Sequence, residues 1–277
     1  MFIDAHQHYW RYNSNEYGWI DQSMSAIRRD FLPRDLEAEL ESNGFCGSVA
    51  VQTRQTLEET RWLLELAEQS RSILGVVGWI DLGSPEARSQ LRSFTSNRKL
   101  VGIRHIVQGE PDDRFLIRPD FLHGISLLEE FDLAYDILIY TRHLPVAAEF
   151  VERFPRQRFV LDHLAKPPIK SGEIKLWAEG IRRLAAFPNV FCKLSGLVTE
   201  ADWERWQPEQ VHPYLDVAFD CFGPERLMIG SDWPVCLVAS SYTRVIETVK
   251  KYLGRYSPEI REAVMGGNAR RFWRLTP

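Results

Sequence analysis

Residues 2–8 of the chain read Phe2-Ile-Asp-Ala-His6-Gln-His8, a short apolar run that ends in two histidines. Short runs of branched and aromatic residues, bounded by polar segments, are typical of buried strands. Seven similar runs recur along the rest of the chain. We therefore expect strands at residues 2–6, 46–52, 74–80, 101–106, 133–139, 158–162, 190–194 and 227–230.

Amphipathic stretches with helix start and stop signals separate these runs. Serine or threonine stands at the start of three expected helices, at Thr56, Ser84 and Ser257. Gly44 is expected to end a helix that begins near Pro33. Successive runs begin about 25 to 45 residues apart, which matches a strand, a helix and their loops. Alternation of strand and helix predicts a parallel α/β sheet, and eight repeats favour a single (β/α)8 barrel of the TIM type.

Length and composition agree with one domain spanning residues 1–277. The chain is 44% hydrophobic and 26% charged, and we find no linker or low-complexity segment. Its net charge of -4 does not predict binding to nucleic acid. No run of 18 apolar residues predicts a membrane span, and no leader sequence is apparent. The four cysteines are scattered, so we expect reduced thiols and a cytoplasmic protein.

The two histidines of the first run are candidates for chemistry. Side chains alternate along a strand, so Asp4, His6 and His8 are expected to share a face. If this face is inward, His6 and His8 stand at the mouth of the barrel, with Asp4 one layer deeper. Paired imidazoles can hold a divalent metal ion or donate hydrogen bonds to a carbonyl oxygen. Packed or solvent-facing histidines are the commoner alternative, but the position at a strand end favours a functional pair.

The last run supplies a candidate base. In Leu227-Met-Ile-Gly-Ser-Asp232, alternation places Met228, Gly230 and Asp232 on one face, with Asp232 at the strand end. A carboxylate there can bind a metal ion or take a proton from water. The structural alternative is an aspartate that caps the following turn.

A third strand end carries His163. Phe159, Leu161 and His163 are expected to alternate onto one face, which places His163 at the mouth. A single histidine is more often a core residue. Together with His6, His8 and Asp232, however, it predicts a polar cluster where the strand ends of a closed barrel meet.

Further strand-end residues are candidates for binding a substrate with hydroxyl or carboxylate groups. They are Arg104, Lys166, Lys193, Gln52, Trp79 and Arg142. His105 must face away from Arg104, and we favour Arg104 as the residue that faces the pore. The aromatic connection at residues 9–29 either borders the active face or covers the rim. Cys236 could be a nucleophile, but a buried, inert thiol is the favoured interpretation.

The motifs together resemble the amidohydrolase superfamily, in particular its lactonase branch with L-fuconolactonase-like, L-rhamnonolactonase-like and pyrone-dicarboxylate lactonase-like enzymes. The matching segments are Ile3-Asp-Ala-His6-Gln-His8, Gly102-Ile-Arg-His105, Phe159-Val-Leu-Asp-His163-Leu-Ala-Lys-Pro167, Cys192-Lys-Leu-Ser-Gly196 and Ile229-Gly-Ser-Asp232-Trp-Pro234. They cover nearly the whole chain in the order that the branch shows. The resemblance implies a metallo-dependent-hydrolase-like barrel with a hydrolytic site at its mouth.

The resemblance also assigns roles to four residues. It implies that His6, His8 and His163 polarise a lactone carbonyl or bind a metal ion, and that Asp232 is the general base. The fifth run, which is followed by Tyr140, lacks the histidine of binuclear members, and the fourth offers no lysine. The expected cofactor is therefore either none or one divalent ion, zinc or manganese, held by His6, His8, His163 and Asp232.

The expected reaction is opening of a small lactone, most simply a sugar lactone, by water that Asp232 activates. One alternative is a metal-dependent decarboxylase of a related branch, and another is hydrolysis of a dicarboxylate lactone. A third is a barrel that binds a sugar acid without turnover. The expected partner is the small lactone substrate alone, without nucleic acid or membrane, and association into a homo-oligomer stays open.

Overall fold

The structure, a computed structural model, describes residues 1–276. Eight parallel strands follow one another around a barrel in sequence order. They are β1 (Phe2–Gln7), β2 (Phe45–Val51), β3 (Ile73–Gly78), β4 (Leu100–Ile106), β5 (Ala134–Leu138), β6 (Phe159–Leu161), β7 (Val190–Leu194) and β8 (Leu227–Ile229). The predicted (β/α)8 barrel is confirmed, and the predicted strand ends differ from these bounds by no more than two residues.

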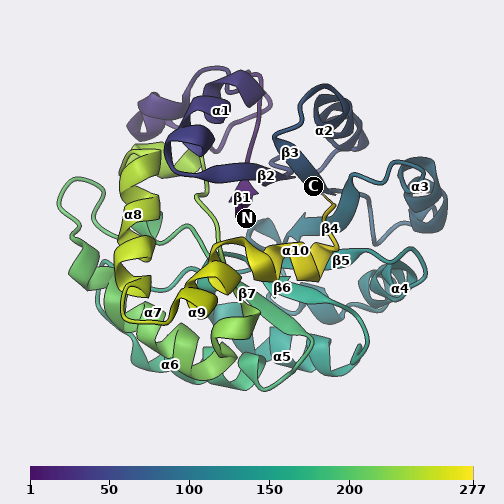
Figure 1. Ribbon diagram of the computed structural model, residues 1–277. Helices are drawn as coiled ribbons and strands as arrows, with labels where there is room; N and C mark the ends of the chain where they lie inside the picture. Colours follow the sequence, from purple (N-terminus) through teal and green to yellow (C-terminus); the bar gives the residue numbers. More distant parts are fainter. Residues whose placement is uncertain (277) are drawn as a thin grey trace.

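Helices surround the strands and cover their outer faces (Figure 1). The eight that follow the strands are α1 (Pro33–Ser42), α2 (Leu57–Gln69), α3 (Ala87–Phe94), α4 (Pro119–Leu128), α5 (Leu144–Glu152), α6 (Lys175–Ala185), α7 (Pro208–Phe222) and α8 (Tyr242–Leu253). Two short helices follow, α9 (Pro258–Glu262) and α10 (Asn268–Trp273). None of the described helices is long and apolar enough to cross a membrane.

The predicted helix signals were mostly right. Thr56 and Ser257 cap their helices by accepting hydrogen bonds from the backbone N–H groups three residues on. Gly44, with a φ of 77°, follows α1 as expected. The predicted start at Ser84 is wrong, because α3 begins at Ala87. Ser84 instead forms a turn in which its hydroxyl accepts from the N–H of Glu86.

The seam between the first and last strands closes the barrel. The backbone N–H of Asp232 donates to the carbonyl of His6 at 2.8 Å, and that of His8 donates to Trp233 at 2.7 Å. Gln7 and Trp233 form a parallel bridge between these two bonds. The hydrogen bonds of closure are thus made by the residues predicted to carry the chemistry.

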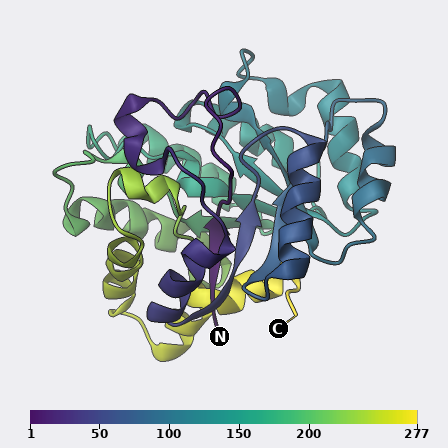
Figure 2. The ribbon, with the colours of Figure 1, turned by 90° about the horizontal axis from the view of Figure 1, so that it is seen from above.

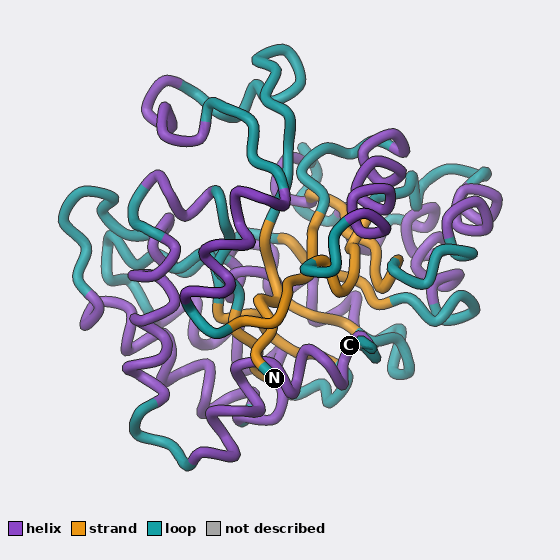
Figure 3. The backbone as a smooth tube through the Cα atoms, turned by 45° about the horizontal axis from the view of Figure 1, so that its top comes forward, coloured by secondary structure: helices purple, strands orange, loops and turns teal. Residues whose placement is uncertain are grey.

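One end of the barrel is filled by α10. Its Phe272 and Trp273 are buried among interior residues such as Ile3, Val160 and Met228. Figure 2 shows α10 (yellow) and the N-terminus at this end, and the loop that follows β1 (dark purple) at the other. The tube in Figure 3 likewise shows loops projecting beyond the strands at that other end. The substrate-accessible mouth lies there, at the carboxyl ends of the strands.

The expected alternation fails in β1. Asp4 does not lie beneath His6, since its carboxylate accepts hydrogen bonds from the Tyr242 hydroxyl of α8 and the N–H of Ser231. An irregularity in the pairing of β1 with β2, between Asp4 and Gln7, accounts for the difference. Such bulges reset which face a side chain occupies, and here the bulge places His6 and His8 inward without Asp4.

The expected alternation in β6 is also wrong. Phe159 and Leu161 pack outward into the helical layer, whereas Val160 belongs to the barrel interior. Asp162 continues the inward face and forms an ion pair with Arg104. His163 reaches the mouth only because the backbone leaves the strand geometry after Leu161.

Candidate active site

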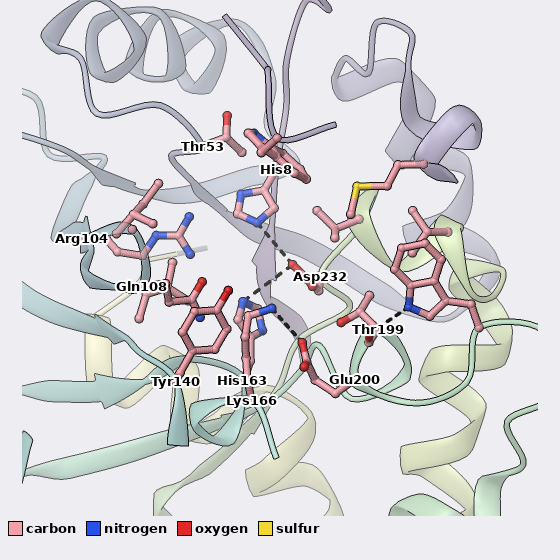
Figure 4. Close-up of a pocket in the computed structure, with 18 residues that line it drawn as sticks. His8, Thr53, Arg104, Gln108, Tyr140, His163, Lys166, Thr199, Glu200 and Asp232 are labelled. Carbon is pink, nitrogen blue, oxygen red and sulfur yellow. Dashed lines mark hydrogen bonds and ion pairs between the residues drawn. The ribbon is translucent and has the colours of Figure 1, made fainter. Parts of the chain in front are cut away.

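A cavity of about 490 Å³ opens at the carboxyl ends of the strands, a size that suits a small ring with several substituents. Of the ten predicted site residues, five line it: His8, Arg104, His163, Lys166 and Asp232. Figure 4 shows Asp232 between His8 and His163, with Arg104 to one side. The structure therefore brings the three predicted motifs to one point.

The carboxylate of Asp232 is the centre of the cluster. Its Oδ1 lies 3.3 Å from His8 Nε2 and 3.8 Å from the Nε2 atoms of His6 and His163. Burial alone would raise the pKa of Asp232, but the imidazoles, His163 foremost, outweigh burial and hold the pKa below its ordinary value. Burial lowers the pKa of His163 to about 4. Near neutral pH, a carboxylate therefore faces an uncharged His163.

Three of these residues fit a divalent cation. His8 Nδ1 lies 2.7 Å from the carbonyl oxygen of Val51, which can only accept, so Nδ1 carries the proton and Nε2 presents a lone pair. That lone pair faces Asp232 Oδ1, so two acceptors need a proton or a cation between them. His6 Nε2 is 3.2 Å from His8 Nε2, and ligand atoms around tetrahedral zinc lie roughly 3.3 Å apart.

A second possible ligand set, His6, Asp162 and His163, suits a metal ion less well. The Lys193 ammonium already contacts both Asp162 Oδ1, at 2.9 Å, and His6 Nδ1, at 3.1 Å. The Lys193 ammonium therefore already supplies the positive charge at this position.

A left-handed turn positions His163. Residues 163–166 all have φ between 50° and 58°. Each residue in this region costs about 1–2 kcal/mol unless the residue is glycine, so the surrounding contacts must hold the turn. One such contact joins His163 Nδ1 to the Ser195 hydroxyl at 2.9 Å. The strained turn is a feature of the site rather than of the scaffold, because it aims His163 and Lys166 into the cavity.

Gly196 leaves the space that this turn needs. A Cβ atom at Gly196 would lie 2.6 Å from His163 Nδ1, and the residue has a φ of 61°. We expect Gly196→Ala to lower kcat/KM by roughly 10-fold or more, because the methyl group displaces the imidazole from Asp232. Steady-state kinetics with thermal unfolding as a control checks this. Unchanged kinetics in a folded variant would mean that the position of His163 does not matter.

A buried ion network lies behind the histidines. Lys193 donates to Asp136 Oδ2 and forms an ion pair with Asp162 Oδ1 at 2.9 Å, and Arg104 Nη1 donates to Asp162 Oδ2 at 2.9 Å. The formal charges of these four groups cancel. Burial, opposed by Lys193, raises the pKa of Asp136 to about 7. Burial also acts on Asp162, but there Lys193, His6 and Arg104 outweigh it and lower the pKa.

Lys193 and Gln52 do not line the cavity. Lys193 is fully buried, and Trp273 of α10 covers it, with Nζ 5.1 Å from the ring centroid. The Gln52 amide donates to the carbonyl of Arg104, and Gln52 oxygens accept from the guanidinium. Lys193 holds His6 in place, and Gln52 holds Arg104. Strand register puts Lys193 and Gln52 one layer below the mouth.

Trp79 and Arg142 lie elsewhere. Trp79 points into a neighbouring hollow, where its indole donates to His105 Nδ1 at 3.3 Å. His105 stacks on Phe115 there, so Arg104 rather than His105 faces the pore, as expected. Arg142 is half-exposed and donates to Asp113 at 2.9 Å.

The cavity is also lined by residues that were not among the ten predicted site residues. They are Trp19, Met24, Thr53, Ile106, Gln108, Gly109, Leu138, Tyr140, Thr199, Glu200, Trp203, Val235 and Val238. Tyr140 follows β5 and could have been found by the strand-end rule. Glu200 lies in a turn after β7, where the sequence carries no strand-end signal.

The structure also places the aromatic connection after β1 and Cys236. The connection after β1 does both things considered for it, since Trp19 lines the cavity while Tyr9, Trp10 and Tyr17 are buried over the rim. Cys236 is buried, and burial raises the pKa of its thiol well above the ordinary value. A thiol in that state is a poor nucleophile.

Glu200 forms an ion pair with Lys166, whose Nζ lies 2.8 Å from Glu200 Oε1. Both side chains are partly exposed to the cavity, at 21% and 23%. Burial lowers the pKa of Lys166, but Glu200 outweighs burial and the pKa is raised. Lys166 is therefore a cation whose charge is neutralised within the cavity wall (Figure 4).

Comparison with known proteins agrees with this geometry. The family model described as amidohydrolase matches residues 3–275. An L-fucono-1,5-lactonase of Burkholderia multivorans is 42% identical, covering 99% of this chain and 96% of that protein. One of Burkholderia ambifaria is also 42% identical, covering 99% and 95%. The crystal structure of a Burkholderia multivorans amidohydrolase with bound zinc superposes with a TM-score of 0.97 at 41% identity, over 100% of both chains. The chain belongs to the amidohydrolase family.

Proposed function

We propose that the protein is a lactonase that opens small sugar lactones, with Asp232 as the general base. The observation that carries the proposal is the convergence of His6, His8 and His163 on Oδ1 of Asp232 at the mouth of the barrel. Similarity to two L-fucono-1,5-lactonases supports a sugar lactone as the substrate. Ionised Asp232 can accept a proton, and the uncharged His163 beside it can donate a hydrogen bond.

The reaction proceeds by attack of water on the lactone carbonyl carbon. Asp232 uses Oδ1 toward the histidines, which leaves Oδ2 to accept a proton from the water. As the ring C–O bond breaks, protonated Asp232 returns this proton to the departing alkoxide, and a hydroxy acid results. Each well-aimed donor to the developing oxyanion contributes about 3–4 kcal/mol.

We propose that His6, His8 and Asp232 can hold one divalent ion, zinc or manganese. When bound, such an ion polarises the carbonyl. Arg104 and Lys166, on the cavity wall, orient the substrate, and the ring of apolar residues around them excludes bulk water. Gln52 and Lys193 support this arrangement from below.

A panel of lactones with a pH indicator tests the proposal, since each turnover releases an acid. We expect hydrolysis of L-fuconolactone and related neutral sugar lactones, and no decarboxylation of aromatic acids. Each substrate is measured with added zinc or manganese and after chelation. Loss of turnover on chelation assigns carbonyl polarisation to an ion, whereas retained turnover assigns it to the imidazoles. Absence of hydrolysis across the panel in both states contradicts the proposal.

A further inference from the structure

The charges around the cavity suggest which lactones the site accepts. Among the described residues that line it, the acidic side chains and the lysine and arginine side chains are Arg104, Lys166, Glu200 and Asp232. Arg104 is bound to Asp162 and to Gln52. Lys166 is bound to Glu200. Each cation on the wall already has an anionic partner, and the positive and negative charges of the four groups cancel.

This arrangement is unfavourable for a substrate that carries a carboxylate away from the reacting ring. Such a group would lie near Asp232 and Glu200, and it would compete with Glu200 for the charge of Lys166. A neutral polyol meets no such obstacle, because Glu200 can accept hydrogen bonds from hydroxyl groups through its second oxygen while Lys166 donates to their oxygens. The pair thus presents both a donor and acceptors to one substrate.

We propose that Glu200 determines the charge specificity of this site: it neutralises Lys166, so that neutral sugar lactones are bound and carboxylated lactones are rejected. The inference rests on the proposed lactonase function and adds the charge of its substrate. It also concerns the product, because ring opening creates a carboxylate inside the same cavity. Because the lysine of the wall is already paired with Glu200, the wall binds that sugar acid less tightly, which favours its release.

The test compares two lactones that differ in one group. L-galactonolactone is neutral, and L-galactarolactone carries a carboxylate in place of the terminal hydroxymethyl group. The variant Glu200→Gln keeps the size of the side chain and frees Lys166. We expect the ratio of kcat/KM for the carboxylated over the neutral lactone to rise by about 10-fold or more, the effect of one charge-assisted hydrogen bond. Inhibition by L-galactonate should strengthen in the same direction.

A matched control is Glu204→Gln. Glu204 is an exposed residue of the same loop. Its substitution by glutamine removes the same charge without changing the partner of Lys166. We expect no change of the ratio in this variant. In the double variant Glu200→Gln/Lys166→Met, the gain of the single variant should disappear, because the cation that receives the carboxylate is gone.

The outcomes separate this inference from the lactonase proposal. If Glu200→Gln leaves the ratio unchanged, or shifts it no more than Glu204→Gln does, the inference is wrong even though neutral lactones are hydrolysed. If the wild-type protein hydrolyses no lactone, the lactonase proposal fails. Calorimetric titration with L-galactonate and L-galactarolactone then tests the charge preference alone, and equal affinities in wild type and Glu200→Gln would overturn it.

Discussion

Asp232→Asn is expected to reduce kcat/KM for a sugar lactone by a factor on the order of 10³, within the range that loss of a general base produces. Asparagine has nearly the shape of aspartate, but its amide cannot take a proton from water. The backbone bond from residue 232 to His6 is unaffected by the change, so the seam of the barrel should stay closed. Steady-state hydrolysis measured with a pH indicator provides the readout.

Thermal unfolding serves as the control for Asp232→Asn. The variant should unfold within a few degrees of the wild type, since Asn replaces a side chain of the same size. Near-wild-type hydrolysis by the folded variant would exclude Asp232 as the base and would require another group to activate water.

Lys193→Met is expected to lower the free energy of unfolding by about 3–5 kcal/mol, the usual cost of removing one partner of a buried ion network. Methionine fills similar space but leaves Asp136 and Asp162 without the ammonium that they share. Equilibrium unfolding in denaturant measures the loss. Substitution of Asp136 by Asn in the same variant should restore part of the stability, because one unpaired carboxylate is then removed.

Lys166→Met is the matched control for Lys193→Met. Lys166 is another lysine of the site, but it is partly exposed and makes one ion pair, so its loss should cost less stability than the loss of Lys193. The two lysines are thus expected to differ in kind, with Lys193 acting on stability and Lys166 on KM. A Lys193 variant of normal stability and raised KM would mean that Lys193 contacts substrate, as the sequence alone suggested.

The barrel and its central cluster could be predicted from the sequence because they depend on spacing. Eight apolar runs separated by helix-length segments specify the architecture, and the carboxyl ends of parallel strands meet at one edge. His6, His8 and Asp232 lie at such ends, and closure of the seam brings them together. The residue type at each strand end was therefore enough to predict these three site residues.

Other parts of the site depend on local backbone departures that a periodic reading cannot anticipate. The bulge in β1 separates Asp4 from His6, and the left-handed turn after β6 turns His163 toward the mouth while Phe159 points outward. Lys193 was predicted as a strand-end residue that binds substrate, but depth along the barrel axis decides between contact with substrate and support from below. Glu200 enters from a loop whose path follows from tertiary packing rather than from its own sequence.

The seam between β1 and the segment after β8 has a consequence for the life of the polypeptide. His6 is synthesised long before Asp232, so the nascent chain carries the two histidines of β1 well before the carboxylate that they contact. Only when the two extremes of the fold dock does the carboxylate meet its imidazoles. A partly folded form in which β1 or β8 is not yet paired therefore lacks the cluster around Asp232. We expect lactone hydrolysis to appear only when the barrel has closed.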